Sequence, residues 1–572
     1  MERHPQRSGQ NNSQLTMHNI TMKRFAFLIF SLLISHFSPL LAQKSESHNA
    51  EISRHLELFD DIYRQLDLYY VDTLSADTTI TWAIKSMLSH VDPFTQYYPE
   101  DDDDLRQMAT GKYAGIGSII RYNMKERRAM IIEPYEGTPS QQAGMRAGDV
   151  ILTIDGVDVL DKPTPAVSNM LRGEAGTTLE VRVKRQGEAQ PLTFRLTRKT
   201  IQLPSVPYFG MQSDSLGYIY LSSFTTGSTR EVRHALMELR RQGMKRLVLD
   251  LRDNGGGAID EAVNIVNLFV GKGQKVVYTK GKLASSNREY YTTSEPLDTV
   301  TPIVVLVNGA TASSAEILSG SLQDMDRAVV MGTRTYGKGF VQAIHDVPYR
   351  GNLKLTVSRY YIPSGRCIQA YDYRHLTSDG RVGTVPDSLT NVFYTRGGRE
   401  VRDGGGIKPD IEAQPDSLPS LVYDVAQSDE LFGYVTQFTG QHPTIAPAGD
   451  FNLSDEDYAQ FVQHMVSEKF ESHRRTTEVL KLLRDAARLE GCYDLAEAAF
   501  DSLEARLTPS LESELLRHRE SIRPYIEDEI VGRYYYQRGR SQHLLRSDSV
   551  FDRAVELLND EERYKSILRV IK

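Results

Sequence analysis

A serine between a buried strand and a helix is the first candidate for chemistry in this sequence. Residues 307–317 read VNGATASSAEI and follow the apolar run PIVVLVN at 302–308, which is typical of a strand buried on both faces. A helix start offers unpaired N–H groups and partial positive charge, and both would stabilise an anion developing beside Ser313. The pattern indicates a serine nucleophile, although Thr311, Ser313 or Ser314 could instead simply cap the helix.

A lysine between two glycines is the second candidate. Lys338 lies in the segment GTRTYGKGFVQ at 332–342, after another apolar run at 328–331. Neighbouring parallel strands bring their C-terminal ends to one edge of a sheet, where the sites of α/β proteins form. An apolar wall would lower the pKa of the amine, which could then take the serine proton. The alternative is a solvated loop lysine, the usual fate of this residue type.

Two further segments could support this pair. Gln342 lies four residues after Lys338, one turn away if the segment is helical, and its amide could hold the lysine amine. Residues 250–257 read DLRDNGGG, and three glycines after a strand let a substrate backbone approach closely. Arg252 and Asn254 are interpreted as ordering this turn.

These segments lie in a region where strands and helices alternate. Between residues 199 and 420 the rhythm predicts a largely parallel sheet covered by helices. The strands are expected at Gly217–Ser222, Arg246–Leu251, Pro302–Val307 and Ala328–Met331. The helices are expected at Thr229–Gln242, Ala258–Val270 and Ala312–Met325.

The flanking regions have other patterns. Residues 49–110 are predicted to be helical, because apolar residues recur there at helical spacing. Residues 111–198 contain short β-type runs punctuated by Gly and Pro, with one helix at Thr164–Leu171. Beyond residue 421 the chain is predicted to be helical, and one helix carries an apolar stripe: Val479, Leu482, Leu483, Ala486 and Leu489.

Length, charge and cysteine content exclude several classes of protein and of functional site. A chain of 572 residues implies several domains, and the net charge of −8 argues against a nucleic-acid partner. The two cysteines, Cys367 and Cys492, form neither a disulfide framework nor a metal motif. No metal or organic cofactor is expected. Cys367 as a nucleophile is an alternative, but a small buried apolar role is the simpler interpretation.

The N-terminus predicts export. Lys23 and Arg24 precede the apolar run Phe25–Ser35, and Ala42 follows, which is typical of a secretory signal. Residues 1–42 are therefore interpreted as a signal peptide with an upstream polar extension, and Met22 as the true start. The run is short for a membrane span. A retained signal anchor, which would give membrane association, is the alternative.

The chemical motifs resemble those of the carboxy-terminal processing proteases, peptidase family S41. The family pattern T-A-S-A-S-E-I is matched here by T-A-S-S-A-E-I, which aligns the nucleophile with Ser313 and leaves Ser314 as the second candidate. The lysine of the family follows its serine by 25 residues and the glutamine follows by four more, where Lys338 and Gln342 stand. The resemblance implies that the amides of Gly256 and Ser314 bind the oxyanion.

Residues 113–117 (YAGIG) and 144–151 (GMRAGDVI) resemble a PDZ domain of the bacterial protease type. The resemblance implies that the amides of Gly115, Ile116 and Gly117 receive a substrate carboxylate, and that the peptide adds as a strand. We therefore expect a multi-domain α/β protein with N-terminal helices (49–110), a β-sandwich-like PDZ domain (111–198), a crotonase/Clp-like peptidase core (199–420) and a helical C-terminal region of unknown role (421–572).

The resemblance implies a serine endopeptidase that cleaves exported, periplasmic proteins near or from their C-terminal tails. Its partners would be protein or peptide substrates with exposed tails. A non-catalytic PDZ scaffold that binds tails is the alternative from another functional class. A trypsin-like PDZ protease would need a G-N-S-G-G motif, which the sequence lacks. A crotonase that binds acyl-CoA is not expected beside a signal peptide and a PDZ domain.

Overall fold

The computed structural model describes residues 48–98, 110–348, 351–376 and 382–568. The predicted signal segment, with Met22, lies outside these residues. The chain divides into two units, one ending at Met87 and one beginning at Leu88, and each is described by itself. The first unit is helical at residues 48–69 and enters α2 (Ala76–Ser89). Its apolar stripe is exposed, with Leu56 at 63%.

A β-sheet domain follows in the second unit. Its sheet has the order β3-β4-β5-β7-β8, β6 pairs with β5, and β2 pairs separately with β9. Helix α5 packs beside the edge strand β3, and Val167 of α5 shares a buried core with Ile131 and Val181. The bounds are β2 Lys112–Gly115, β3 Ser118–Asn123, β4 Arg128–Pro134, α4 Pro139–Gln142, β5 Val150–Ile154, β6 Val157–Asp158, α5 Thr164–Leu171, β7 Thr178–Lys184, β8 Leu192–Thr197 and β9 Lys199–Gln202.

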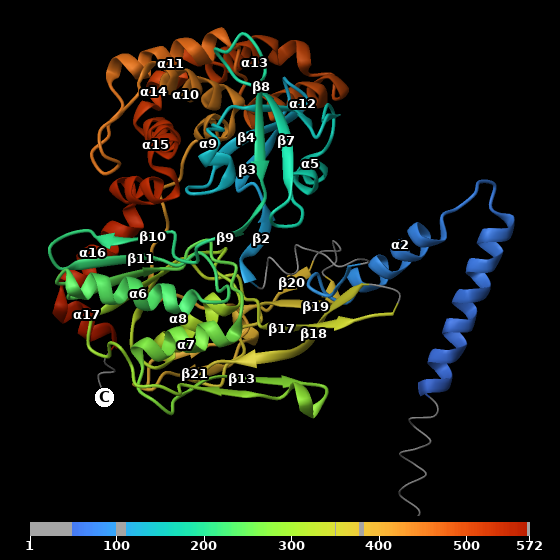
Figure 1. The fold of residues 1–572 in the computed structure, drawn as a ribbon, viewed down its shortest axis with the longest axis vertical. Coiled ribbons are helices and arrows are strands. Elements are labelled where there is room, and N and C mark those ends of the chain that lie inside the picture. Colours follow the sequence, from blue (N-terminus) through green and yellow to red (C-terminus); the bar gives the residue numbers. More distant parts are fainter. Residues whose placement is uncertain (1–47, 99–109, 349–350, 377–381, 569–572) are drawn as a thin grey trace, which may run out of the picture. The chain divides into compact units, whose positions relative to one another are not determined.

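A largely parallel sheet forms the next domain (Figure 1). Its order is β10-β11-β12-β15-β16-β23, and only β10 is antiparallel to its neighbour. This confirms the expected α/β architecture. The bounds are β10 Tyr208–Met211, β11 Leu216–Tyr220, α6 Ser228–Arg241, β12 Arg246–Asp250, α7 Ile259–Phe269, β15 Ile303–Val307, α8 Ser314–Asp324, β16 Val329–Gly332 and β23 Ile411–Glu412.

An antiparallel sheet adjoins this domain and carries the segment after Lys338. Its order is β1-β18-β13-β14, and β17 also pairs with β18. Residues 49–110 were predicted to be helical, and that prediction is wrong for residues 96–98. They form strand β1, which pairs with β18. The bounds are β1 Gln96–Tyr98, β13 Lys275–Gly281, β14 Glu289–Tyr291, β17 Phe340–Asp346 and β18 Asn352–Tyr361, with the small hairpins β19 Tyr371–Leu376, β20 Val382–Thr384, β21 Val392–Tyr394 and β22 Glu400–Arg402.

Helices cover both faces of the parallel sheet. Helices α6, α7 and α8 bury one face, and the last two helices, α16 (Ser549–Asn559) and α17 (Glu561–Leu568), bury the other. The Tyr564 hydroxyl of α17 donates to the carbonyl oxygen of Ile303 in the central strand. The end of the chain therefore completes the core of this domain, a role that the sequence analysis did not predict.

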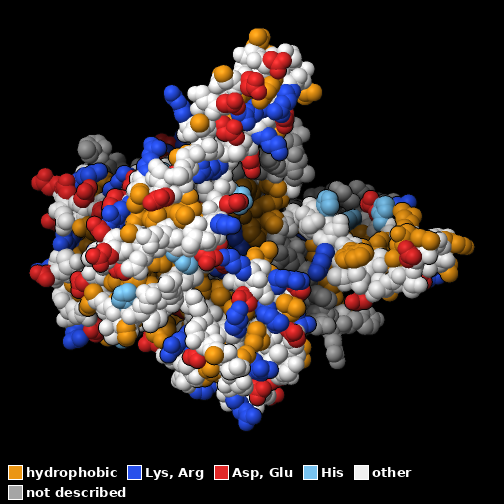
Figure 2. All heavy atoms as spheres, turned by 90° about the horizontal axis from the view of Figure 1, so that it is seen from above, with side chains coloured by type: hydrophobic (Ala, Val, Ile, Leu, Met, Phe, Trp, Pro, Cys, Tyr) orange, Lys and Arg blue, Asp and Glu red, His pale blue; other side chains and the backbone are white. Residues whose placement is uncertain are grey.

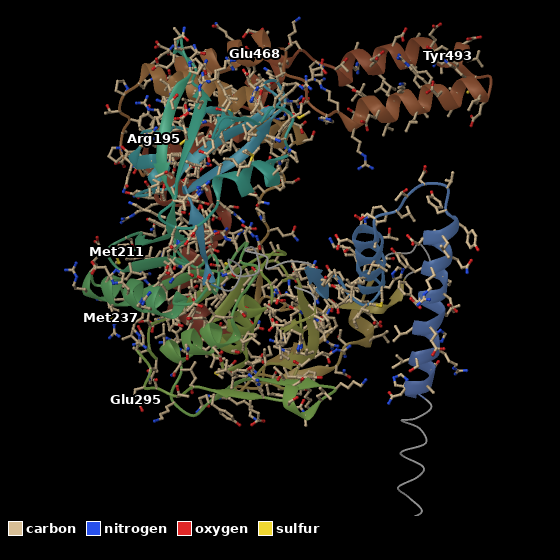
Figure 3. All side chains as sticks on the ribbon, turned by 45° about the vertical axis from the view of Figure 1, so that its right-hand side comes forward. Arg195, Met211, Met237, Glu295, Glu468 and Tyr493 are labelled. Atoms are coloured by element: carbon tan, nitrogen blue, oxygen red, sulfur yellow. The ribbon has the colours of Figure 1, made fainter. Side chains whose placement is uncertain are left out.

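The remaining C-terminal helices form a separate core of their own. Their bounds are α9 Ser420–Gln427, α10 Asp429–Gln441, α11 Asp455–Ser467, α12 Arg475–Leu489, α13 Tyr493–Leu507, α14 Leu511–Arg517 and α15 Arg519–Leu544. Figure 3 labels Tyr493 on the α12–α13 pair. The predicted apolar stripe of α12 is exposed, with Leu489 at 90%, while Leu480 and Phe500 form the small core of the pair.

Charged side chains of both signs are interspersed over the face drawn in Figure 2. On this face (Figure 2) the two signs of charge are mixed and do not form an extended positive patch of the kind that binds a nucleic-acid backbone. Within the described residues, no helix is both long enough and apolar enough to cross a membrane.

Candidate active site

Ser313 occupies a sharp turn between β15 and α8. Its backbone has φ 57° and ψ −119°, and a positive φ is costly for a residue with a side chain unless neighbouring contacts hold it. Two contacts do so next to the serine: the Thr311 hydroxyl donates to the Leu251 carbonyl oxygen at 2.8 Å, and the Ala312 N–H donates to the Asn254 carbonyl oxygen at 2.9 Å. The loop after β12 therefore holds Ser313 in its strained conformation.

The two adjacent serines have different environments. Ser314 is fully buried, and its hydroxyl donates to the carbonyl oxygen of Gly257 at 2.8 Å. Ser313 is only half-buried. Among the described residues, none accepts a hydrogen bond from the Ser314 N–H. Ser313 thus has the accessible hydroxyl, while Ser314 offers its backbone amide.

Glu316 connects the serine turn to the lysine loop. Its side chain is fully buried. One oxygen, Oε2, accepts from the N–H groups of Ser313 at 2.8 Å and Lys338 at 2.9 Å. The other, Oε1, accepts from the Gly337 N–H at 2.7 Å and the Thr335 hydroxyl at 2.5 Å. Burial raises the pKa of Glu316 to about 7 despite these bonds. A single carboxylate therefore positions both backbone segments.

Tyr360 joins the same two segments through their carbonyl groups. Its side chain on β18 is 1% exposed, and its hydroxyl lies 2.7 Å from the Lys338 oxygen and 3.1 Å from the Ser313 oxygen. Glu316 and Tyr360 thus bridge the serine and lysine backbones through amides and carbonyls respectively.

The lysine loop requires its flanking glycines. Gly337 has φ +85°, and a Cβ there would lie 2.3 Å from the Ala370 Cβ, so any side chain would displace the loop. The Gly339 N–H donates to Oε1 of Gln369 at 2.8 Å. A Cβ on Gly339 would lie 2.8 Å from the Gln369 nitrogen, so close packing leaves no room for a side chain on either side of Lys338.

The amine of Lys338 is largely withdrawn from water. Its Nζ lies 4.4 Å from the centroid of the Phe94 ring. Burial is the main cause that lowers the pKa of Lys338 to about 8, and repulsion by Lys354 adds to it, while Glu316 and Asp92 oppose the change. A substantial neutral fraction of the amine therefore exists near neutral pH.

Gln342 differs from its predicted arrangement. It lies on strand β17 and not on a helix, and its amide donates to the Thr356 hydroxyl on β18 at 3.3 Å. No hydrogen bond among the described residues joins the Lys338 amine to Gln342 or to the Ser313 hydroxyl. The structure brings the serine and lysine backbones together but leaves these side chains unbonded to one another.

The glycine turn lies against the serine, as its predicted role requires. A Cβ on Gly256 would lie 2.7 Å from the Ser313 Cβ and 2.9 Å from the Ser314 nitrogen, and φ is +96°. The Gly256 N–H, however, donates to Oδ1 of Asn254 at 2.8 Å. Of the two amides predicted to bind an oxyanion, that of Gly256 is therefore engaged within the protein.

The predicted carboxylate loop of the β-sheet domain lies at the start of its edge strand. Gly117 has φ +77°, and its carbonyl oxygen accepts from the Thr138 and Ser140 hydroxyls. Within the described part of the chain, no group accepts from the Ile116 or Gly117 N–H. Gly115 is the last residue of β2. These amides precede an unpaired strand edge beside α5.

Cys367 does not have the properties of a nucleophile. The thiol is half-buried, and burial raises its pKa above the ordinary value, so the reactive thiolate is disfavoured. Arg252 has a structural role, because its guanidinium pairs with Asp250 and with Asp548 near α16.

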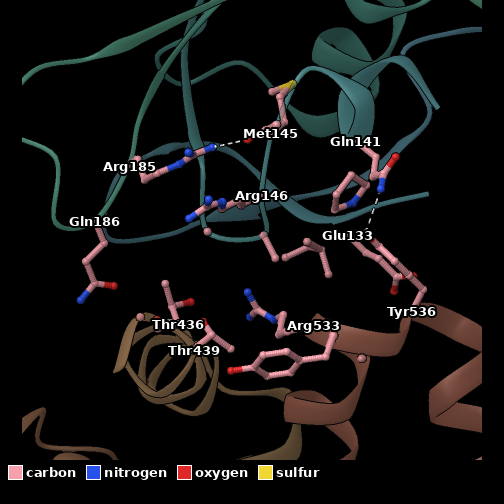
Figure 4. A pocket seen from close by; sticks show the side chains of 18 of the residues that line it. Glu133, Gln141, Met145, Arg146, Arg185, Gln186, Thr436, Thr439, Arg533 and Tyr536 are labelled. Atoms are coloured by element: carbon pink, nitrogen blue, oxygen red, sulfur yellow. Dashed lines mark hydrogen bonds between the residues drawn. The ribbon is translucent and has the colours of Figure 1, made fainter. Parts of the chain in front are cut away.

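A cavity of about 630 Å³ lies away from the serine, between the β-sheet domain and helices α10 and α15. Figure 4 shows Arg146, Arg185 and Arg533 around it. Neither Ser313 nor Lys338 lines this cavity. Its walls come from segments far apart in the chain, so no local sequence pattern indicates it.

Replacing Tyr360 with phenylalanine is expected to reduce kcat about 10-fold with little change in KM, because the bridge between the two carbonyls is lost. The free energy of unfolding should fall by about 1–2 kcal/mol. Peptide hydrolysis and urea unfolding measure these effects. Tyr458→Phe is the matched control, since that buried hydroxyl donates to the Leu515 oxygen in the helical region. An equal loss of kcat in both variants would contradict a local role for Tyr360.

Three parts of the chain match known protein families. Residues 215–387 match the model of peptidase family S41, 130–185 a PDZ domain, and 421–558 the C-terminal helical domain of a probable PDZ-protease. The chain is 32% identical over 403 residues to a carboxy-terminal-processing protease of Bartonella bacilliformis, covering 69% of this chain and 91% of the relative.

It is also 35% identical over 312 residues to a carboxyl-terminal-processing protease of Synechocystis sp., covering 54% of this chain and 70% of the relative. Among solved structures, a photosystem II D1 C-terminal processing protease is 30% identical, with 62% of this chain and 87% of that chain covered and a TM-score of 0.35. The match to the Bartonella bacilliformis protease, at 32% identity over 91% of that relative, shows that the chain belongs to peptidase family S41, with the carboxy-terminal-processing proteases, and is a serine-type peptidase.

Proposed function

We propose that this peptidase cleaves exported proteins near or from their C-terminal tails through an acyl-enzyme on Ser313, with Lys338 as the base. The observation that carries the proposal is the double bridge by Glu316 and Tyr360, which joins the backbones of these two residues. The lowered pKa of the Lys338 amine supports its role as a base near neutral pH.

The proposed reaction has two stages. The neutral Lys338 amine takes the proton from the Ser313 hydroxyl as the serine oxygen attacks the scissile carbonyl carbon. The C–N bond then breaks, the leaving amine takes a proton from Lys338, and an ester remains on Ser313. In the second stage Lys338 deprotonates a water molecule, which attacks the ester carbonyl carbon. The bond between that carbon and the Ser313 oxygen then breaks, the protonated Lys338 returns its proton to the Ser313 oxygen, and the acid is released. Hydrogen bonds absent from a free enzyme can form in the substrate complex.

The oxyanion of each stage needs two donors. The Ser314 N–H at the start of α8 is the first, because no described residue occupies it and the helix dipole favours an anion there. The Gly256 N–H is the second donor. To bind the oxyanion it must first release its hydrogen bond to Oδ1 of Asn254. Gln342 is proposed to hold the lysine amine, which requires it to leave Thr356.

The PDZ domain is proposed to present the substrate. A terminal carboxylate would bind the amides at Gly115–Gly117, and the tail would add as a strand along β3, whose outer edge is unpaired within the described sheet. Localisation is a separate proposal: the charged and apolar N-terminal segment supports export to the periplasm.

Amidation of a substrate tail tests this presentation step. A loosely folded reporter with an apolar tail is prepared with either a free C-terminal carboxylate or a C-terminal amide. We expect KM to rise about 10-fold for the amide, because each factor of ten corresponds to about 1.4 kcal/mol of lost binding, with kcat little changed. Equal kinetics for both reporters would contradict PDZ presentation. Tail binding without any cleavage would favour a non-catalytic scaffold.

A further inference from the structure

An aromatic ring from outside the peptidase core covers the Lys338 amine. The Phe94 ring centroid is 4.4 Å from Nζ. Two more rings pack against Phe94: those of Phe340 at 6.5 Å and Tyr373 at 5.9 Å between centroids, both edge to face. Ring carbons thus fill space beside the partly buried amine that water would otherwise occupy, and reduced hydration favours the neutral form of an amine.

Local hydrogen bonds hold Phe94 in place. Asp92 is buried, and its Oδ1 accepts from the N–H groups of Phe94 and Thr95, each at 2.8 Å. Strand β1 follows at once and pairs with β18 as an added edge strand. The segment Asp92–Tyr98 is therefore fixed at both ends, and the backbone of Phe94 has little freedom.

The same segment contacts the residue that supports Gln342. The Thr356 N–H donates to the Thr95 hydroxyl at 3.2 Å, and the Thr356 hydroxyl accepts from the Gln342 amide at 3.3 Å. The segment therefore adjoins the surroundings of two proposed catalytic side chains, Lys338 and Gln342.

Charged groups around the amine act in opposite directions. Lys354 on β18 disfavours the charged amine, while Glu316 on α8 and Asp92 favour it. The face of an aromatic ring also attracts a cation, so Phe94 both attracts and dehydrates the amine. Burial is the first cause of the lowered pKa of Lys338, and Phe94 is one of the groups that bury the amine. Two other ionisable groups adjoin the amine's aromatic surroundings: the Arg359 guanidinium lies over Phe340, and Tyr373, one of the packed rings, carries a hydroxyl.

We propose that Phe94 is a positioning residue of the active site, whose ring excludes water from the Lys338 amine, so that segment Asp92–Tyr98 completes the peptidase site. The inference rests on the proposed role of Lys338 as the base. It follows that any displacement of this segment from β18 would rehydrate the amine and reduce activity at neutral pH.

The test compares the pH dependence of kcat/KM, between pH 6 and 10, for Phe94→Ala, Phe94→Leu and the intact protein. For Phe94→Ala the midpoint should rise by about one pH unit, activity at pH 7 should fall about 10-fold, and activity above pH 9 should recover to within about 2-fold. Phe94→Leu should shift less, because it keeps an apolar side chain. If Phe94→Ala does not fold, Phe94→Leu still provides the test.

Tyr97→Ala is the matched control. That ring belongs to the same segment but lies beside Gly351. A Cβ added to Gly351 would be 3.1 Å from Cε2 of Tyr97. Its midpoint should equal that of the intact protein. A uniform loss of activity in Phe94→Ala and Phe94→Leu, with unmoved midpoints, would overturn the inference in favour of a merely structural role.

A second readout does not depend on proteolysis. In a Ser313→Ala background, acetic anhydride acetylates Lys338 at a rate that follows its neutral fraction, and mass spectrometry of the peptide quantifies it. The midpoint of this titration should rise in both Phe94 variants. An unmoved midpoint would overturn the inference. If the acetylation midpoint rises but the Lys338→Met variant still hydrolyses peptides fully, Lys338 is not the base. The shielding of its amine by Phe94 would then still stand.

Discussion

Ser313→Ala is expected to lower peptide hydrolysis by at least about 10⁴-fold, because removal of a nucleophile leaves only binding and oxyanion stabilisation. Ser314→Ala should stay within about 3-fold of the intact protein, since an alanine retains the N–H proposed for the oxyanion. Ser314 is not expected to be the nucleophile, because its buried hydroxyl already donates to the Gly257 carbonyl oxygen. Hydrolysis of a fluorogenic peptide under single-turnover conditions measures both.

Stability measurements separate these two variants from misfolding. Ser314→Ala leaves the Gly257 oxygen without its donor and should cost about 1 kcal/mol in the free energy of unfolding. Ser313→Ala removes a half-buried hydroxyl and should cost less. A folded Ser314→Ala protein that has lost all activity would reverse the assignment of the nucleophile.

Lys338→Met is expected to reduce kcat/KM by about 10³–10⁴-fold, because a thioether cannot accept the serine proton. The intact protein should become more active as pH rises through about 8, since the amine is protonated below its pKa and available as a base above it. At pH 6 the rate should be about one hundredth of the plateau. Steady-state kinetics between pH 6 and 10 measure this profile.

Lys338→Arg serves as the charge-retaining control. A guanidinium keeps the positive charge but does not lose its proton in this pH range, so this variant should be as inactive as Lys338→Met. A profile that is flat from acidic to alkaline pH in the intact protein, or activity in the arginine variant, would contradict a lysine base.

The sequence predicted the parallel sheet because its elements are locally encoded. The run at 302–308 is apolar on both faces, and the strand that it forms, β15, is buried throughout. The serine turn was predicted for a similar reason, since small polar residues between a strand and a helix favour such a turn. Thr311 and Ala312 then make the contacts that hold it.

Contacts between distant segments could not be predicted in this way. Tyr360 reaches the site from β18, and Phe94 reaches it from a segment more than 200 residues before Lys338. Neither has a local signature, because each acts through residues that are remote in the chain. Glu316 had a weak signal, as an acidic residue at the third position of a helix after a serine cap.

The helical spacing of apolar residues predicted helix α12, but not which of its faces is buried. The apolar stripe of α12 has helical spacing, yet Leu482 and Leu489 are exposed, and the buried side chains lie on another face of the helix. Gln342 would lie one turn from Lys338 only if the segment were helical, but pairing with β18 makes it a strand. In both cases tertiary packing decided the outcome.

Mapping of the modified serine tests most directly whether Ser313 is the nucleophile and Lys338 its base. The full chain is treated with a serine-reactive phosphonate, and the modified residue and its rate of modification are determined by mass spectrometry, in the intact protein and in Lys338→Met. We expect one adduct, on Ser313. It should form faster as pH rises through about 8, and at least about 100-fold more slowly without the lysine. An adduct on Ser314, or equal rates in both proteins, would contradict these roles.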